Sequence, residues 1–165
     1  MQSEYFANLN SFLNNPKLVE SDYRVVFKPH PELLRPVDGV RFINLFDIPD
    51  NVYLAIDESY QELLNGSSVL ITDYSSVFFD FAYLKKPVIY YHPNDDYHYE
   101  KSYFDYDTMG FGDITKSETE LLDKLTYYIE NGCQMEDEYK KRVDKFFTHI
   151  DKNNSKRVYD WIKKN

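Results

Sequence analysis

The sequence predicts an α/β domain: a Rossmann-like, doubly wound parallel sheet with helices on both faces. Short, fully apolar runs alternate with helical segments along the chain, and such runs are typical of parallel strands that are buried on both sides. One βαβ unit is clear, because an apolar run at 69–71 precedes a helical segment at 77–84 and a second apolar run at 87–91. A right-handed crossover is expected between its two strands.

Before this unit, the pattern predicts one helix, three strands and a second, brief helix. Apolar residues recur every three or four positions in the first helix. The first strand ends at Pro29 and Pro31, which cannot continue a hydrogen-bonded ladder, and Asn65 with Gly66 closes the brief helix. These elements are expected at 5–13 (helix), 23–27, 40–46 and 52–56 (strands), and 59–64 (helix).

The C-terminal part of the chain predicts helices. Helical periodicity covers 118–130, 136–147 and 155–163, and Asn131 with Gly132 separates the first two. No internal repeat, low-complexity tract or long flexible linker is visible in the sequence. Residues 1–165 are therefore expected to form a single Rossmann-like nucleotide-binding domain.

Length and composition are those of a globular protein. The 165 residues suffice to bury a core without disulfides or metals, and 42% hydrophobic with 28% charged residues excludes a disordered chain. The chain contains no run of about 18 apolar residues, which is the length needed to cross a bilayer. Cys133 is the only cysteine and no secretory signal pattern opens the chain, so a cytoplasmic location is expected.

The charge balance argues against nucleic-acid binding. Nineteen basic and 28 acidic residues give a formal net charge of −9, which repels nucleic acids and anionic lipids unless basic residues gather locally. The basic clusters are small, at 140–142 and 163–164, and solvated helix faces explain them better than a polyphosphate site.

A polar turn at 72–76 carries the first sign of function. In open α/β sheets, ligands bind beyond the carboxyl ends of the strands, where helix N-termini offer unpaired N–H groups. The hydroxyls of Thr72, Ser75 and Ser76 could add hydrogen bonds to phosphate oxygens, so this turn suits a pyrophosphate. The alternative is that Ser75 is only a helix N-cap.

Two further side chains are candidates for the same site. Asp80 follows Ser76 by four residues and shares its helix face, where a carboxylate could accept hydrogen bonds from ribose hydroxyls. Its apolar neighbours suggest burial or a cleft, although Asp80 could also be a solvated helix residue. His30 stands where the first strand ends and could interact with a phosphate or a departing nucleotide, or be a structural histidine.

These elements together resemble a known family. The motif Lys28-Pro29-His30-Pro31, followed by the run at 70–81 with its Thr-Asp-Tyr-Ser-Ser string, is similar to the C-terminal half of the CDP-glycerol:poly(glycerophosphate) glycerophosphotransferases. Members of this family polymerise teichoic acids. The likeness spans about residues 23–162 and continues through 86–91, 104–106, Gly110, Asp151 and 155–158.

The resemblance implies a role for each candidate residue. His30 would be the catalytic residue and contact the nucleotide's phosphates, while Thr72, Ser75 and Ser76 would cradle the pyrophosphate of the donor. Asp80 would lie near the ribose, and Arg157 is a further candidate for phosphate binding. The donor would be CDP-glycerol or another nucleotide-activated group, with no separate cofactor and no metal.

The resemblance also implies what this chain lacks. The family has a GT-B architecture, whose N-terminal domain carries the histidine thought to activate the acceptor hydroxyl, and that domain is expected to be absent here. We therefore expect the isolated chain to bind nucleotide weakly without turnover. The full-length protein would be the transferase, acting on a polymer or lipid-linked acceptor, peripherally at the cytoplasmic face of the membrane.

Two other functions stay open from the sequence. The same turn would serve a GT-B glycosyltransferase that uses a nucleotide sugar for capsule or surface polysaccharide, and a non-catalytic nucleotide-binding or interaction module is also possible. Aromatic residues, mostly tyrosines, crowd the segment at 90–106 and could stack on a base or sugar, pack under their loop, dock on another domain or form an exposed patch. His92, Asp95, Asp96 and His98 in that segment match no compact metal-binding spacing.

Overall fold

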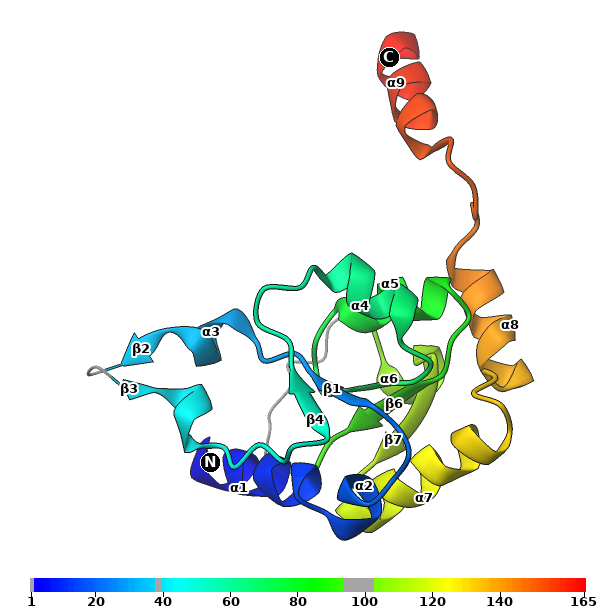
Figure 1. Cartoon of the computed structure of the whole chain (residues 1–165). Helices are drawn as coiled ribbons and strands as arrows, with labels where there is room; N and C mark the ends of the chain where they lie inside the picture. Colours follow the sequence, from blue (N-terminus) through cyan, green and yellow to red (C-terminus); the bar gives the residue numbers. More distant parts are fainter. Residues whose placement is uncertain (1, 38–39, 94–102) are drawn as a thin grey trace.

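Short parallel strands lie between two layers of helices (Figure 1). This computed structural model describes residues 2–37, 40–93 and 103–165. Strand β1 (Val25–Phe27) pairs in parallel with β4 (Val52–Leu54). A second parallel sheet has the order β5 (Leu70–Thr72), β6 (Val88–Tyr91) and β7 (Gly112–Thr115). The predicted α/β class is confirmed, but within the described residues the parallel strands form two ladders rather than one.

Strand β6 has buried side chains on both of its faces. Val88 and Tyr90 belong to one hydrophobic cluster and Ile89 belongs to another, as expected from the two-residue repeat of a strand. All three side chains are fully buried. Helices therefore cover both faces of this sheet, as the sequence predicts.

Each cluster is completed by its own set of helices. In Figure 1, α1 (Gln2–Leu13), α2 (Pro16–Val19) and α7 (Glu118–Glu130) lie below the strands and pack against Ile89. Above the strands lie α4 (Tyr60–Gly66) and α5 (Val77–Tyr83), and α8 (Asp137–Phe146) lies to their right; these helices contribute to the cluster of Val88 and Tyr90. Three further helices are α3 (Pro31–Leu34), α6 (Tyr106–Met109) and α9 (Asn154–Lys164).

The strand predicted at 40–46 is wrong over most of its length. Strand β3 (Val40–Arg41) pairs antiparallel with β2 (Pro36–Val37) for two residues only. Pro36 has no N–H with which to extend this ladder. The chain turns instead into a 3₁₀ helix, η1 (Phe42–Leu45), which buries Ile43.

Helix α4 extends further than the sequence predicts and includes Asn65 and Gly66. Its start is a capping box, in which Ser59 accepts a hydrogen bond from the N–H of Glu62 and the Glu62 side chain bonds back. At its end, Lys86 Nζ donates to the carbonyls of Leu64 (3.0 Å), Asn65 (2.8 Å) and Ser67 (2.7 Å). A cation at these carbonyls stabilises a helix C-terminus, which explains why α4 extends to Gly66.

Replacing Lys86 by methionine tests this cap. Because Lys86→Met leaves three carbonyls without their charged donor, it should lower the free energy of unfolding by about 1–3 kcal/mol, measured by urea denaturation. The neighbouring Lys85 makes an exposed ion pair with Asp144 at 2.6 Å, so the control Lys85→Met should cost only about 0–1 kcal/mol. Equal losses in the two variants would contradict the assignment.

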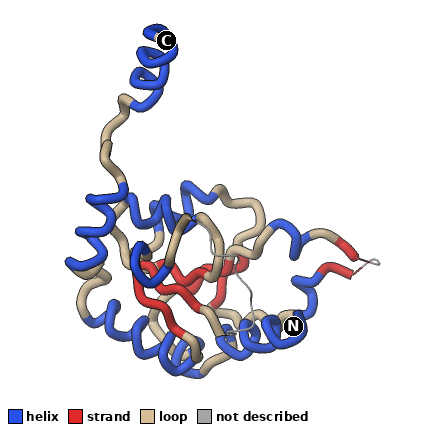
Figure 2. The backbone as a smooth tube through the Cα atoms, turned by 180° about the vertical axis from the view of Figure 1, so that it is seen from behind, coloured by secondary structure: helices blue, strands red, loops and turns tan. Residues whose placement is uncertain are grey.

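Helix α9 stands apart from the rest of the chain (Figures 1 and 2). Its side chains include Val158, Tyr159, Trp161 and Ile162, each of which is 58–67% exposed. Two lysines, Lys163 and Lys164, occupy its last turn, where cations are favourable. This helix therefore contributes little to the core.

The fluorescence of Trp161 tests this placement, because it is the single tryptophan of the chain. At 67% exposure, its emission should match that of tryptophan in water and should stay nearly constant when urea unfolds the core. Far-UV circular dichroism, recorded on the same samples, should report the core transition. A blue-shifted emission that moves together with the circular dichroism signal would show that α9 packs on the domain.

Candidate functional site

The carboxyl ends of β5, β6 and β7 meet at one edge of their sheet. The register aligns Thr72 with Tyr90, and Tyr91 with Thr115. The 72–76 turn, His92 and the start of the segment after β7 therefore follow the sheet at the same edge. This is the part of an open α/β sheet where ligands usually bind.

The 72–76 turn offers hydroxyl groups that the fold hardly uses. Ser76 is the N-cap residue of α5, but within the described part of the chain its side chain makes no capping hydrogen bond. Ser75 Oγ accepts only a long hydrogen bond of 3.5 Å from the N–H of Val77. The alternative role of Ser75, as a helix cap, is thus a weak one, and both hydroxyls could bond a ligand.

Asp80 lies one turn into α5, and its side chain is exposed. The apolar neighbours Phe78, Phe81 and Ala82 turn into the core instead, so of the alternatives left open by the sequence, burial of Asp80 is not observed. Ser76 is exposed as well, which fits the shared face predicted from their four-residue spacing. A role of Asp80 near a ribose stays a prediction.

His30 is exposed in the loop between β1 and α3. Its carbonyl accepts a hydrogen bond from the N–H of Leu33 at 2.8 Å, and the preceding Pro29 is buried. The neighbouring Lys28 has a structural role, because its Nζ donates to the carbonyls of Ile56 (2.7 Å) and Glu58 (2.9 Å). Lys28 thereby ties the end of β1 to the segment after β4.

Arg157 lies on α9 and is not brought to the 72–76 turn (Figures 1 and 2). Its guanidinium pairs with the Asp151 carboxylate at 2.5 Å and donates to Asn154 Oδ1 at 2.7 Å. This guanidinium, with the N–H of Asn153, holds the pKa of Asp151 well below its ordinary value. The predicted phosphate contact of Arg157 is therefore not part of the site in this arrangement.

An aromatic cluster, which we call the edge cluster, lies against the 72–76 turn and consists of Tyr74, Tyr90, His92 and Tyr106. The Tyr74 and His92 rings stack with centroids 4.0 Å apart and planes 8° apart. Tyr106 meets the His92 ring edge-on at 5.0 Å and the Tyr90 ring at 4.9 Å. Such offset and edge-to-face pairs stabilise beyond simple burial.

The aromatic segment at 90–106 therefore packs inward over much of its described part. Phe104 contacts Phe78 and Phe111 as well as Tyr106, and Tyr103 alone among its described tyrosines is strongly exposed, at 86%. Phe104 and Tyr106 therefore pack against the described core rather than form an exposed patch. Tyr97 and Tyr99, together with Asp95, Asp96 and His98, lie outside the described residues.

His92 is the site residue that the sequence did not reveal. It is 8% exposed, its backbone N–H donates to the Thr115 carbonyl at 2.8 Å, and its Nε2 has no hydrogen-bond partner within the described chain. Burial lowers the pKa of the imidazole below its ordinary value of 6.5, against opposing contributions from the backbone and charge of Asp73 and the charge of Asp107. At neutral pH the ring is therefore uncharged.

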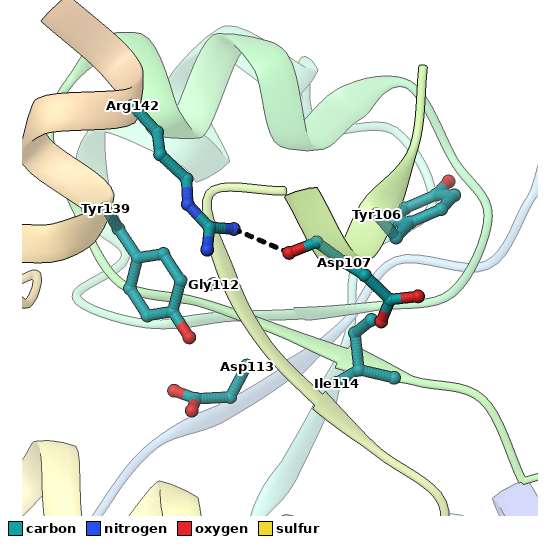
Figure 3. A pocket seen from close by; sticks show the side chains of 7 residues that line it. All are labelled: Tyr106, Asp107, Gly112, Asp113, Ile114, Tyr139 and Arg142. Atoms are coloured by element: carbon teal, nitrogen blue, oxygen red, sulfur yellow. Dashed lines mark hydrogen bonds between the residues drawn. The ribbon is translucent and has the colours of Figure 1, made fainter. Parts of the chain in front are cut away.

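A pocket of about 180 Å³ lies beside β7 and between α6 and α8, and Tyr106 of the edge cluster is part of its lining (Figure 3). Arg142 spans it and donates to the carbonyls of Asp107 (3.1 Å) and Gly110 (2.9 Å). Asp113 accepts from Tyr128 Oη at 2.8 Å and pairs with Lys124 at 2.7 Å. These charges serve the packing of α7 and α8, and none of the predicted site residues lines this pocket.

The sequence of this chain matches a known protein family over nearly its whole length. Residues 3–164 match the profile of the CDP-Glycerol:Poly(glycerophosphate) glycerophosphotransferase family. The chain belongs to this family. The match includes both the 72–76 turn and the Lys28–His30 motif, so the resemblance seen in the sequence is confirmed.

The curated relatives of this chain are named as proteins of teichoic acid synthesis. The minor teichoic acid biosynthesis protein GgaB of Bacillus subtilis is 45% identical over 97% of this chain and 18% of its own length. The teichoic acid ribitol-phosphate primase of Bacillus spizizenii is 31% identical over 88% of this chain and 36% of its own. A solved wall teichoic acid polymerase, TagF, has a TM-score of 0.49 and 23% identity, covering 99% of this chain and 47% of that one. The chain thus spans less than half of each of these proteins.

The described residues also bear on two other kinds of site. Among residues 2–37, 40–93 and 103–165, the helices lack the length and hydrophobicity that a membrane span requires. Over the same ranges, no group of three or more histidine, cysteine, aspartate or glutamate side chains is arranged to hold a metal ion.

The lowered pKa of His92 makes stability depend on pH. The unfolded imidazole binds a proton more readily than the folded one, so the stability contributed by neutral His92 is complete above about pH 6.5 and is lost as the pH falls through the folded-state pKa. Denaturant titrations at about pH 7.5 and about pH 5.5 should show this loss in the native chain and a smaller loss in His92→Phe. Identical pH dependence in both would contradict it; Asp151 titrates at far lower pH and does not interfere.

Proposed function

We propose that this glycerophosphotransferase-family chain binds the nucleotide-activated donor of teichoic acid synthesis, CDP-glycerol or a closely related CDP-polyol. The observation that carries the proposal is the 72–76 turn, which presents two little-used serine hydroxyls at the carboxyl edge of a parallel sheet. The names of relatives support a polyol phosphate as the transferred group, since they include both ribitol-phosphate and glycerol-phosphate enzymes.

The turn suits a diphosphate for electrostatic reasons. The first backbone N–H groups of a helix have no partner within the helix, and they favour an anion placed before them. The hydroxyls of Thr72, Ser75 and Ser76 would add directed hydrogen bonds to the phosphate oxygens. Asp80, exposed on the same face as Ser76, would accept hydrogen bonds from the ribose of the bound nucleotide.

The reaction of the longer protein would be a phosphoryl transfer. An acceptor hydroxyl attacks the β-phosphorus of the donor in line, a new phosphodiester bond forms, and the bond to the bridging oxygen breaks so that CMP leaves. His30, at the end of β1, would stabilise the charge on the departing nucleotide or give it a proton. Arg157 would contact the donor phosphates only if α9 approached the 72–76 turn in the longer protein.

The remaining parts of the reaction would come from outside these residues. A base must take the proton of the acceptor hydroxyl, and we place it in a separate acceptor-binding domain of the full-length protein. The acceptor would be the growing polymer or a lipid-linked primer, which places the enzyme peripherally at the cytoplasmic face of the membrane. The chain alone should therefore bind the donor without turning it over.

Calorimetric titration with CDP, UDP, GDP and CDP-glycerol tests the proposal. The native chain should prefer the cytidine nucleotides, and Ser75→Ala combined with Ser76→Ala should weaken their binding by about tenfold or more. The fold should tolerate this change, because Ser76 makes no capping bond and that of Ser75 is long. Ser68→Ala is the matched control, since Ser68 is exposed and precedes the other end of β5.

Each result of the titration has a definite meaning. A preference for UDP would replace the proposal by a nucleotide-sugar glycosyltransferase. Binding that is equally strong in the double variant would remove the turn from the site. Absence of binding by every nucleotide would favour an interaction module, and transfer from CDP-glycerol by the chain alone would show that it holds its own base.

A further inference from the structure

His92 places a hydrogen-bond acceptor inside the edge cluster without using it. Its Nε2 is buried and has no partner in the described part of the chain, although its ring stacks directly on Tyr74 of the 72–76 turn. A buried polar atom without a partner costs about 1–3 kcal/mol. Since native proteins satisfy nearly all such atoms, this one needs an explanation.

Packing alone does not explain a histidine here. The ring contacts of His92, a stack on Tyr74 and an edge-on contact with Tyr106, are ones that a phenylalanine ring could also make. Phenylalanine would avoid the cost of the unpaired nitrogen. The interaction of the ring with the Asp73 backbone accounts for one ring nitrogen and leaves the buried Nε2 unexplained.

The surroundings of His92 fix what its Nε2 can do. The His92 ring also interacts with the backbone of Asp73. Because Nε2 has no partner in the described part of the chain, we assign this interaction to Nδ1, which then carries the proton while Nε2 keeps its lone pair. The charged groups that face the ring are Asp73, Asp107 and Lys116. A neutral imidazole of this tautomer accepts a hydrogen bond and cannot donate one from Nε2.

We propose that His92 is a binding residue of the donor site, whose Nε2 accepts a hydrogen bond from a hydroxyl group of the bound nucleotide-activated donor. This inference rests on the proposed function, because the ligand is the one assigned to the 72–76 turn. The hydroxyl belongs to the ribose or to the transferred polyol. Neighbouring side chains would shift to uncover the atom on binding, as interface side chains commonly do.

The His92→Phe variant should lose affinity for the donor without a comparable loss of stability. The variant keeps the stack on Tyr74 and removes the unpaired nitrogen, but it also loses the interaction with the Asp73 backbone, so its midpoint of urea denaturation at neutral pH should stay close to that of the native chain. Its Kd for CDP-glycerol should rise by about tenfold. If the Kd for CDP rises equally, the hydroxyl is that of the ribose; if only the Kd for CDP-glycerol rises, it is that of the glycerol.

Thr115→Val is the matched structural control. Thr115 is buried at the same edge, and its Oγ1 donates to the Tyr90 carbonyl at 2.9 Å. This substitution should lower the denaturation midpoint and leave the Kd unchanged. Long-range proton–nitrogen spectra of the histidine-labelled native chain give a direct reading, since the Nε2 resonance of His92 should move when CDP-glycerol is added.

The failure of this inference can be told from failure of the proposed function. If CDP-glycerol binds the native chain but His92→Phe binds it equally well and the Nε2 resonance stays in place, His92 is not a ligand residue and the function stands. A His92→Phe variant that loses stability and affinity together would make His92 a structural residue. If no nucleotide binds the native chain, both proposals are overturned.

Discussion

Burial of β6 on both faces is the constraint on which the rest of the structure depends. Val88 and Tyr90 require helices on one side and Ile89 requires them on the other, so the strand can exist only inside a layered domain. Its pairing with β5 and β7 then brings three carboxyl ends to one edge. The polar 72–76 turn and the edge cluster follow directly from that alignment. The site is thus a product of the same burial that forms the core.

The parts of the fold that the sequence predicts are those with strong apolar patterning. The βαβ unit around α5 and the helices α7, α8 and α9 appear close to their expected bounds. Strand β7 was not expected, because Gly112 and Asp113 are residue types that strands usually avoid. Gly112 is nevertheless required there, since a Cβ atom would lie 1.8 Å from the carbonyl oxygen of Val88. The need for glycine at this position comes from the neighbouring strand β6 and is not visible in the local sequence.

The candidate site also has one part that could be predicted from the sequence and one that could not. The hydroxyl-rich turn could be found because its residue types and its place after an apolar run are both visible in the sequence. His92 could not, because its importance lies in burial and in an unused nitrogen, and both depend on the packing of Tyr74 and Tyr106 around it. Arg157 was a candidate through the family resemblance alone; its guanidinium pairs with Asp151, and its contact with a phosphate stays a prediction. The roles of His30 and Asp80 remain predictions.

Lys28 and Lys86 both lie in segments that mark the family resemblance, yet both direct their ammonium groups at main-chain carbonyls. Each side chain also lies over an aromatic ring, that of Tyr60 for Lys28 and that of Phe81 for Lys86. A mutational scan scored by activity would rank these lysines beside the residues that touch the donor, and their positive charge would invite the same interpretation. Loss of activity at either position would instead report a loosened loop or helix end, so a measure of folded protein has to accompany any such scan.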